Sequence, residues 1–204
     1  MPSSSADHAG EVDVVFVCTG NRARSPLAAA MLRRHVHGLP VRVRSRGTME
    51  VGSAAPLRDM VIAAQGLGID LSAHRACSIG AGELAQADLV IGFEPFHVAA
   101  AVVEGGARPD VSFTLAELAS LVPPGVGRGS SPDRALERRL AEELRHANVL
   151  RAGRSRLSAA SIDDPFGAGQ AMFDRLAREI HDLVGDVATA LFGVAAGSAR
   201  PVER

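Results

Sequence analysis

The chain has 204 residues with a formal net charge of −1 at pH 7, and 47% of them are hydrophobic. This content of apolar residues is typical of a globular protein, and a charge so close to zero excludes a general attraction to nucleic acid or to an anionic membrane. With only two cysteines, Cys18 and Cys77, a secreted fold held together by disulfides is excluded as well.

The first predicted elements are a strand and a helix joined by a polar loop. Residues 1–10 are small and polar, and we expect a flexible N-terminus without a signal peptide. The β-rich apolar run over 12–17 predicts a buried parallel strand. After the loop, Pro26 suits the first turn of a helix with Ser25 as its cap, and this helix is expected to end at Gly38.

Strands and helices continue to alternate along the rest of the chain. In chain order we expect a strand over 41–45, a helix over 56–68, a strand over 88–93, a helix over 94–104, a strand over 111–113 and a helix over 114–121. Proline, glycine and serine predict a loop over 122–133. A charged amphipathic helix over 133–151, a loop over 161–169 and a final helix over 171–192 follow.

This alternation predicts an α/β fold, a single-domain three-layer sandwich with a short, about four-stranded parallel sheet between helices on both faces. Ligands bind to such sheets beyond the carboxyl ends of the strands. Cys18 directly follows the first predicted strand, so we expect it at the ligand-binding edge of the sheet.

The loop after the first strand has the features of an anion site; its sequence is Cys18-Thr19-Gly20-Asn21-Arg22-Ala23-Arg24-Ser25-Pro26. We expect the backbone of residues 19–25, at the N-terminus of a helix, to surround a phosphate group. The guanidinium of Arg24 can hold two phosphate oxygens. Both the helix and Arg24 favour the thiolate form of Cys18, to which Ser25 can donate its hydroxyl hydrogen.

The alternative interpretation is a buried cysteine that ends a core strand, which is the usual place of a free cysteine. A lone C-x5-R match is weak, because it occurs often by chance. Here the match lies between a β-rich run and a helix that starts with proline, and serine follows the arginine. This context favours the functional interpretation.

Residues 15–32, VFVCTGNRARSPLAAAML, resemble the phosphate loop V-C-x-G-N-x-C-R-S-P of the low-molecular-weight protein tyrosine phosphatases. Further segments resemble parts of the same family: RSRGT at 44–48, GIDLSAHRA at 68–76, ADLVIGFEPFH at 87–97 and the Asp-Pro-Phe-Gly loop at 164–167. The resemblance covers about residues 12–115 and 161–192. It implies a phosphatase domain over 11–194, with an inserted loop and helix around 122–160 and a flexible tail over 195–204.

The resemblance also implies a mechanism. Cys18 would be the nucleophile of a phosphocysteine intermediate, Arg24 the phosphate clamp and Asp164 the general acid, and neither a metal nor an organic cofactor is implied. Ser45 and His74 would support the loop, together with Asn21 and Ser25 of the loop itself.

Three residues near the mouth of the predicted site bear on the choice of substrate. Arg22 stands at a usually apolar position that lines the substrate crevice, Arg46 stands where the family has alanine, and Phe166 is the one aromatic residue of the acid loop. We expect all three to line the crevice. Ala23 replaces a second cysteine, so a protective disulfide with Cys18 cannot form there.

The expected function is therefore a cysteine-dependent phosphomonoester hydrolase in the cytoplasm. Its substrate would be a phosphotyrosine protein or, as the alternative, a small non-tyrosine phosphoester. An arsenate reductase and a non-catalytic anion-binding module are two further alternatives. We expect no nucleic acid partner and no membrane insertion, since no apolar run reaches ~18 residues, and we expect a monomer or a weak homodimer.

Overall fold

The computed structural model describes residues 11–122, 136–153 and 161–194. Its centre is a parallel four-stranded sheet with the strand order β2-β1-β3-β4. The strands are β1 (Val12–Cys18), β2 (Val41–Gly47), β3 (Leu89–Gly92) and β4 (Ser112–Thr114). The four predicted strands are confirmed, each within two residues of the expected bounds.

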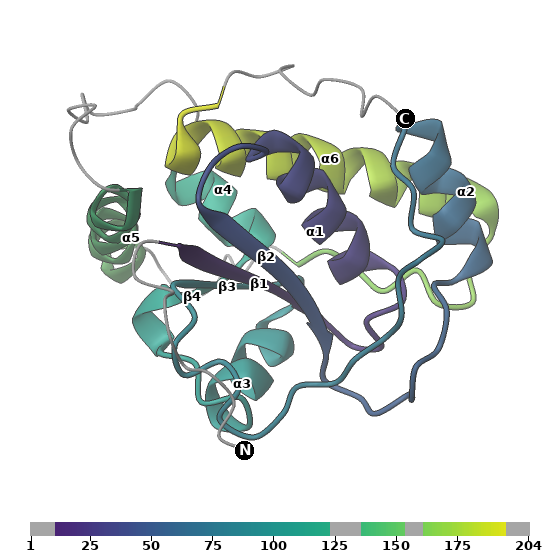
Figure 1. Ribbon diagram of the computed structural model, residues 1–204, viewed down its shortest axis with the longest axis horizontal. Helices are drawn as coiled ribbons and strands as arrows, with labels where there is room; N and C mark the ends of the chain where they lie inside the picture. Colours follow the sequence, from purple (N-terminus) through teal and green to yellow (C-terminus); the bar gives the residue numbers. More distant parts are fainter. Residues whose placement is uncertain (1–10, 123–135, 154–160, 195–204) are drawn as a thin grey trace.

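Helices cover both faces of this sheet, as Figure 1 shows. They are α1 (Arg24–His35), α2 (Arg58–Gly66), α3 (Pro95–Val103), α4 (Leu115–Leu121), α5 (Leu136–Ala152) and α6 (Gln170–Phe192), with a short 3-10 helix, η1, at Pro109–Val111. α1 and α6 lie over one face and α3 lies under the other (Figure 1). The predicted three-layer α/β fold is confirmed. The predictions for 1–10, most of 122–133 and 195–204 lie outside the described residues.

Strand β1 contributes to the core on both faces of the sheet. Val14 and Phe16 pack into the large cluster beneath α1 and α6, whereas Val15 and Val17 pack into the smaller cluster on the α3 side. All four side chains are at most 1% exposed. Because successive side chains of a strand point to opposite faces, a continuous apolar run buries both of them.

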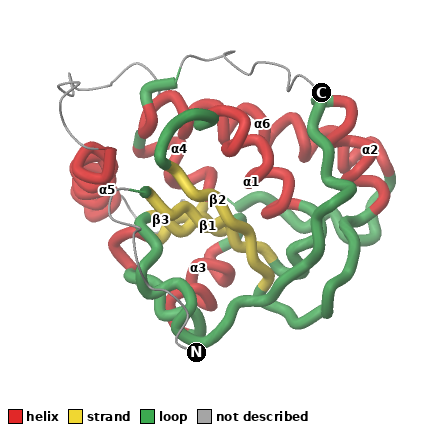
Figure 2. Tube along the Cα trace, in the orientation of Figure 1, coloured by secondary structure: helices red, strands yellow, loops and turns green. Residues whose placement is uncertain are grey.

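The carboxyl ends of the strands place several loops side by side. Cys18 at the end of β1 is paired with Gly47 at the end of β2, and Val17 is paired with Gly92 at the end of β3. Loops lie beyond this end of the sheet (Figure 2). Gly47 packs so closely that a Cβ atom there would lie 2.9 Å from Thr19 O. The loop after β1 is thus seated on the end of β2.

One expectation about α1 is wrong. The helix begins at Arg24, its N-cap is Ala23 and no side chain caps it, so Ser25 is not the cap. Instead, the Ser25 hydroxyl lies 3.0 Å from the sulfur of Cys18. Ser25 lies inside the first turn, and its hydroxyl contacts Cys18, Asn21 and Arg46 O rather than a backbone N–H of the helix. Pro26 lies within the first turn, as expected.

No helix in the described part of the chain is long and apolar enough to cross a membrane.

Candidate active site

A chain of hydrogen bonds holds the sulfur of Cys18 in place. Cys18 is 3% exposed, and its Sγ lies 3.0 Å from Ser25 Oγ. Asn21 Nδ2 donates to the same Oγ at 2.9 Å, and Asn21 Oδ1 accepts from the backbone N–H of Cys77 at 3.0 Å. Asn21 supplies one hydrogen to Ser25, so the hydroxyl hydrogen of Ser25 can be donated to two acceptors, the sulfur of Cys18 and Arg46 O at 3.3 Å.

The backbone of Asn21 adopts a conformation that few residues tolerate. Its φ angle is 50°, in the left-handed region, where asparagine is more acceptable than most residues. His74 Nε2 lies 2.7 Å from Asn21 O. Burial lowers the pKa of His74, so the neutral imidazole donates its Nε2 hydrogen to this carbonyl. His74 therefore lies where a residue that supports the loop must lie.

Arg24 is 1% exposed, and its guanidinium joins three segments of the chain. Nη1 donates to Glu94 Oε1 at 2.5 Å and to Ile162 O at 2.8 Å. Nη2 donates to Asp164 Oδ2 at 2.5 Å. Glu94 precedes α3, and Ile162 and Asp164 precede α6, so tertiary packing fixes the orientation of Arg24.

A buried histidine lies behind the loop. His97 is 0% exposed, and its Nδ1 accepts a hydrogen bond from the backbone N–H of Glu94 at 3.0 Å. Burial, together with the positive charge of Arg24, lowers the pKa of His97 to about 3. The ring is therefore neutral, carries its hydrogen on Nε2 and donates to Thr19 Oγ1 at 3.1 Å.

This contact determines what Thr19 can do. Its Oγ1 accepts from His97 and also from Arg24 Nη2 at 3.3 Å. The hydroxyl hydrogen of Thr19 is then free to point elsewhere, and Thr19 lines the pocket described next. Sequence reasoning missed both Glu94 and His97. Their place directly after the third strand, at the carboxyl edge of the sheet, was a signal that could have pointed to them.

These groups meet at a pocket of about 360 Å³. Its lining consists of Cys18, Thr19, Gly20, Arg22, Ala23, Arg24, Met49, Val51, Leu57, Asp164 and Phe166. Asp164 Oδ1 accepts from the backbone N–H of Phe166 at 3.1 Å, and the Phe166 ring is 77% exposed at the mouth. The aliphatic wall from the segment between β2 and α2 was not expected. Within the described part of the chain, no three His, Cys, Asp or Glu side chains are grouped so that they could hold a metal ion.

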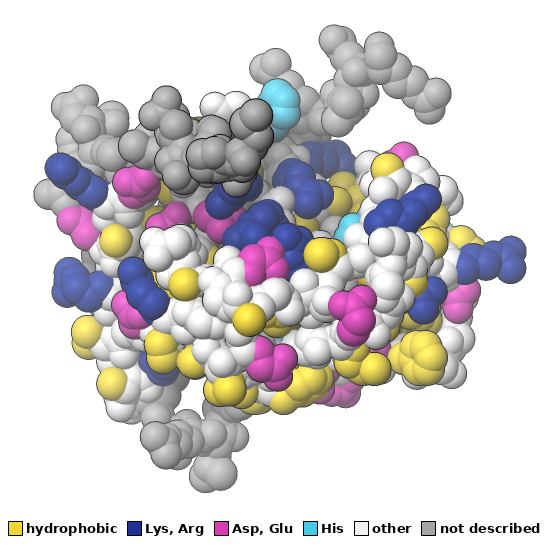
Figure 3. All heavy atoms as spheres, turned by 60° about the horizontal axis from the view of Figure 1, so that its bottom comes forward, with side chains coloured by type: hydrophobic (Ala, Val, Ile, Leu, Met, Phe, Trp, Pro, Cys, Tyr) yellow, Lys and Arg dark blue, Asp and Glu magenta, His cyan; other side chains and the backbone are white. Residues whose placement is uncertain are grey.

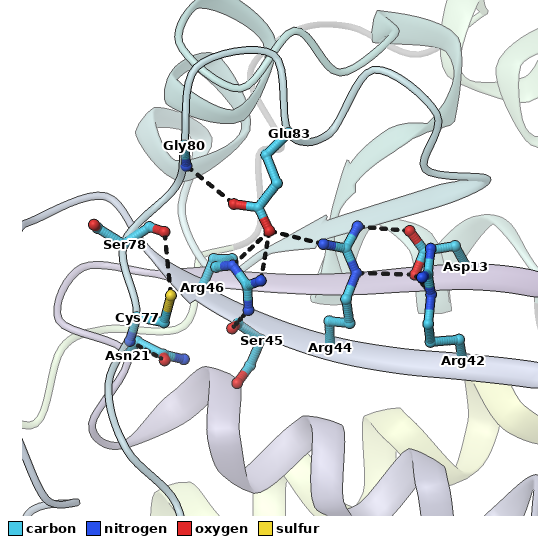
Figure 4. Close-up of polar contacts among 10 residues, drawn as sticks. All are labelled: Asp13, Asn21, Arg42, Arg44, Ser45, Arg46, Cys77, Ser78, Gly80 and Glu83. Carbon is cyan, nitrogen blue, oxygen red and sulfur yellow. Dashed lines mark hydrogen bonds and ion pairs between the residues drawn. The ribbon is translucent and has the colours of Figure 1, made fainter. Parts of the chain in front are cut away.

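The prediction that Arg46 lines the crevice is wrong. Its guanidinium binds Glu83 at 2.5 Å and donates to Ser45 O at 2.9 Å, on the side of β2 where Arg44 binds Asp13 (Figure 4). Side chains alternate along a strand, so Arg46 points away from the face that carries Ser45. Figure 3 shows basic and acidic side chains lying side by side near the middle of one face of the molecule.

The side chains of Ser45 and Cys77 do not support the Cys18 loop through hydrogen bonds. Ser45 is buried at 6% exposure, and no hydrogen bond joins its hydroxyl to the Cys18 loop among the described residues. Cys77 is exposed, and its backbone contributes two contacts. The backbone N–H of Cys77 donates to Asn21 Oδ1, and the carbonyl of Cys77 accepts from Gly47 N at 2.8 Å.

The pocket therefore combines a sulfur nucleophile, a fixed guanidinium, a carboxylate and the uncapped N-terminus of α1. A tetrahedral oxyanion is the ligand that such a set of donors can hold. The carboxylate beside it can move a proton.

Comparisons with known proteins agree with this geometry. The family model described as low molecular weight phosphotyrosine protein phosphatase matches residues 13–116, just over half of the chain. The low molecular weight protein-tyrosine phosphatase A of Mycobacterium tuberculosis is 44% identical over 91 residues, which are 41% of this chain and 53% of that protein. The chain thus spans about half the length of this relative.

Two further similarities extend beyond tyrosine phosphatases. The protein-arginine-phosphatase of Bacillus subtilis is 31% identical over 110 residues, or 52% of this chain and 71% of that protein. The structure of an arginine phosphatase from Geobacillus stearothermophilus shares the fold, with a TM-score of 0.65, 22% identity and coverage of 89% of this chain and 94% of that one. The matched segment includes β1, the Cys18 loop and the Glu94 segment, and so the chain belongs to the low molecular weight phosphotyrosine protein phosphatase family.

Proposed function

We propose that this protein hydrolyses phosphomonoesters through a phosphocysteine intermediate on Cys18. The observation that carries the proposal is the meeting of Cys18, Arg24 and Asp164 at one pocket. Segments from opposite ends of the chain supply these three residues. A nucleophile, an anion clamp and an acid are unlike a set of residues that would meet at one pocket by chance.

In the first step, the Cys18 thiolate attacks phosphorus and a sulfur–phosphorus bond forms. The bond from phosphorus to the ester oxygen breaks, and Asp164 in its protonated form gives its proton to that leaving oxygen. Arg24, the Thr19 hydroxyl and the backbone amides at the start of α1 stabilise the negative charge on the other three oxygens. Ile162 O and Glu94 keep Nη1 of Arg24 oriented during this step.

The hydrogen bond between Arg24 and Asp164 indicates an exchange of partners. Nη2 of Arg24 holds Asp164 Oδ2 at 2.5 Å, and a phosphate oxygen needs the same donor. Binding of the phosphate would free the carboxyl group of Asp164 to turn toward the leaving oxygen. The bond from Phe166 N to the other carboxyl oxygen keeps the side chain at the mouth during this movement.

In the second step, water attacks phosphorus on the opposite side from sulfur. Asp164, now a carboxylate, takes a proton from this water, the sulfur–phosphorus bond breaks, and inorganic phosphate and the Cys18 thiolate are released. The Ser25 hydroxyl, 3.0 Å from Sγ, donates to the sulfur as its negative charge returns.

The substrate we favour is an aryl phosphate such as phosphotyrosine. Phe166 can pack against a phenol ring on one side, and Met49, Val51 and Leu57 offer an aliphatic surface. The name of the Bacillus subtilis relative makes phosphorylated arginine a second candidate. The cationic side chain of Arg22 in the pocket speaks against it, because the leaving group of phosphoarginine is itself a guanidinium.

The proposal is tested by the turnover of p-nitrophenyl phosphate and of phosphotyrosine. Cys18→Ser should abolish turnover, and Asp164→Asn should lower kcat by about 10²–10⁴-fold, since general acid catalysis contributes about that much. The exposed Cys77→Ser is the matched control and should retain wild-type turnover. The proposal fails if wild-type turnover equals that of Cys18→Ser, and phosphate binding without turnover of any ester would instead indicate an anion-binding module.

A further inference from the structure

Arg22 makes two contacts with the segment before α2, one through its side chain and one through its backbone. Its Nε donates to Ala55 O at 2.7 Å, and its own carbonyl accepts from Leu57 N at 2.9 Å. A long side chain is usually free to move into solvent, which costs conformational entropy when it binds a ligand. Here the hydrogen bond from Nε removes part of that freedom in advance, and Arg22 lines the pocket together with Cys18.

The positive charge of Arg22 is not compensated by the protein. Among the described residues no carboxylate forms an ion pair with it. The pocket has one carboxylate in its lining, Asp164, and that group is bound to Arg24. Arg24 in turn is neutralised by Glu94 and Asp164, so the free positive charge of the pocket belongs to Arg22.

The contacts of Arg22 leave its terminal nitrogens for a ligand. Nε is occupied by Ala55, whereas no described residue accepts a hydrogen bond from Nη1 or Nη2. Two neighbouring N–H groups of a guanidinium match the two oxygens of a carboxylate or of a phosphate. Apart from Asp164, the lining residues beyond the Cys18 loop, which are Met49, Val51, Leu57 and Phe166, carry no charge. A second anion on the substrate would therefore bind at Arg22.

We infer that Arg22 is a specificity-determining residue that binds a second anionic group on the substrate, next to the phosphoester that Cys18 attacks. This inference rests on the proposed phosphatase function. The substrate class is a phosphomonoester with a nearby carboxylate or phosphate group. An acidic side chain beside phosphotyrosine in a peptide and the carboxylate of a small phosphoester are two sources of the same chemistry.

The test uses substrate pairs that differ by one negative charge. One pair is 3-carboxyphenyl phosphate and phenyl phosphate; the other is a phosphotyrosine peptide with glutamate beside the phosphotyrosine and the same peptide with glutamine. For each pair, kcat/KM of the acidic substrate is divided by kcat/KM of the neutral one, and this ratio is measured for the wild type and for Arg22→Gln. Comparing the ratios between proteins cancels the intrinsic reactivity of each leaving group.

We expect the ratio to fall about 3- to 10-fold in Arg22→Gln for at least one pair, as charged hydrogen bonds at half-exposed sites contribute about that much. Arg22→Lys should retain part of the preference, and 1 M salt should weaken it in the wild type. Arg108→Gln, which removes the same charge from an exposed residue outside this pocket, is the control and should leave both ratios unchanged.

The two pairs also identify the source of the anion: a fall confined to the peptides indicates a protein substrate, and a fall confined to the small esters indicates a metabolite. Equal loss of kcat/KM on acidic and neutral members in both pairs would overturn the inference, because Arg22 would then act on the ring or on the fold. If the phosphatase proposal itself fails, the wild type turns over none of the four substrates, which is a different result.

Discussion

The contacts of single residues show why the candidate site has a defined shape. Arg24 is held by a carboxylate on either side, and the Thr19 hydroxyl is held by His97. The contact from His97 to Thr19 depends on the charge state of the imidazole ring. The ring is in the neutral form, since a charged ring beside Arg24 would carry a second positive charge into the core. The neutral state of His97 has a measurable effect on stability.

Replacing His97 should make the protein less sensitive to acid. The pKa of His97 is about 3 in the folded protein against 6.5 without burial, so the unfolded chain binds the proton first as the pH falls. Stability present above pH 6.5 is therefore lost between pH 6.5 and about 3, at about 1.4 kcal/mol for each pH unit. Between pH 7.5 and 5.5, the wild type should lose about 1.4 kcal/mol more of its free energy of unfolding than His97→Gln.

Urea unfolding at the two pH values measures this difference. The exposed His37→Gln is a suitable control, and it should respond to pH as the wild type does. If His97→Gln loses as much stability as the wild type does, the histidine is not neutral in the folded protein.

At the scale of elements, the site is built where loops from different strands pack together. The backbone of the Cys18 loop bonds to the segment after β2: Thr48 N donates to Cys18 O at 2.9 Å and Met49 N to Thr19 O at 2.9 Å. Gly47 makes this approach possible, because it has no side chain at the point of contact. The segment that carries Met49 and Val51 thereby becomes a wall of the pocket.

A methyl group at Gly47 should push the loop out of position. The added Cβ would lie 2.9 Å from Thr19 O and 3.1 Å from Asn21 N, and both neighbours are backbone atoms that cannot turn aside. We expect Gly47→Ala to destabilise the protein by about 1–3 kcal/mol, as overpacking does, and to lower kcat/KM for p-nitrophenyl phosphate. Thermal unfolding and steady-state kinetics measure the two effects.

Gly66→Ala is the matched control for this substitution. Gly66 is an exposed residue of α2, and a Cβ atom added to it would have no neighbouring atom within 4 Å, so alanine there should be neutral or slightly stabilising. Wild-type kinetics in Gly47→Ala would show that the end of β2 does not position the loop.

At the scale of the whole molecule, α6 closes the larger core. Its buried side chains recur at helical spacing and face α1, α2 and α4; among them are Phe173, Leu176, Ile180, Val184 and Leu191. The segment before this helix carries Asp164. Packing of α6 therefore holds Asp164 near Cys18, 146 positions earlier in the chain, while no residue of the helix lines the pocket.

Truncation of Ile180 should lower the free energy of unfolding and leave kcat unchanged. Ile180 is 0% exposed, and Ile180→Ala should lower the free energy of unfolding by about 2–5 kcal/mol, the usual cost of such a cavity. Glu179→Ala, at an exposed position of the same helix, should stay within about 0.5 kcal/mol of the wild type. Well below the melting temperature, kcat of Ile180→Ala should remain close to that of the wild type, because Ile180 does not line the pocket. A loss of kcat at that temperature would show that α6 transmits strain to the site.

The sequence by itself determined the architecture and the principal candidates of the site. Apolar runs and helical spacing depend on neighbours along the chain, so the strands, the helices and the three-layer fold could all be predicted from them. Cys18 and Arg24 lie in one short loop between a predicted strand and a helix that starts with proline, a context that indicates an anion site. Asp164 could be named because the Asp-Pro-Phe-Gly loop resembles the acid loop of the family.

Only the tertiary structure decided which distant side chains complete that site. Glu94 and His97 act through Arg24 and Thr19, and their contacts arise because the ends of β1 and β3 are adjacent in the sheet. The alternation of side chains along β2 sends Arg46 to Glu83 on the other face, although its neighbours in sequence suggested the crevice. Local sequence patterns indicate secondary-structure propensity and burial. Contacts between distant segments depend on the order of the strands and on the face of the sheet to which each side chain points, and both are set only when the chain packs.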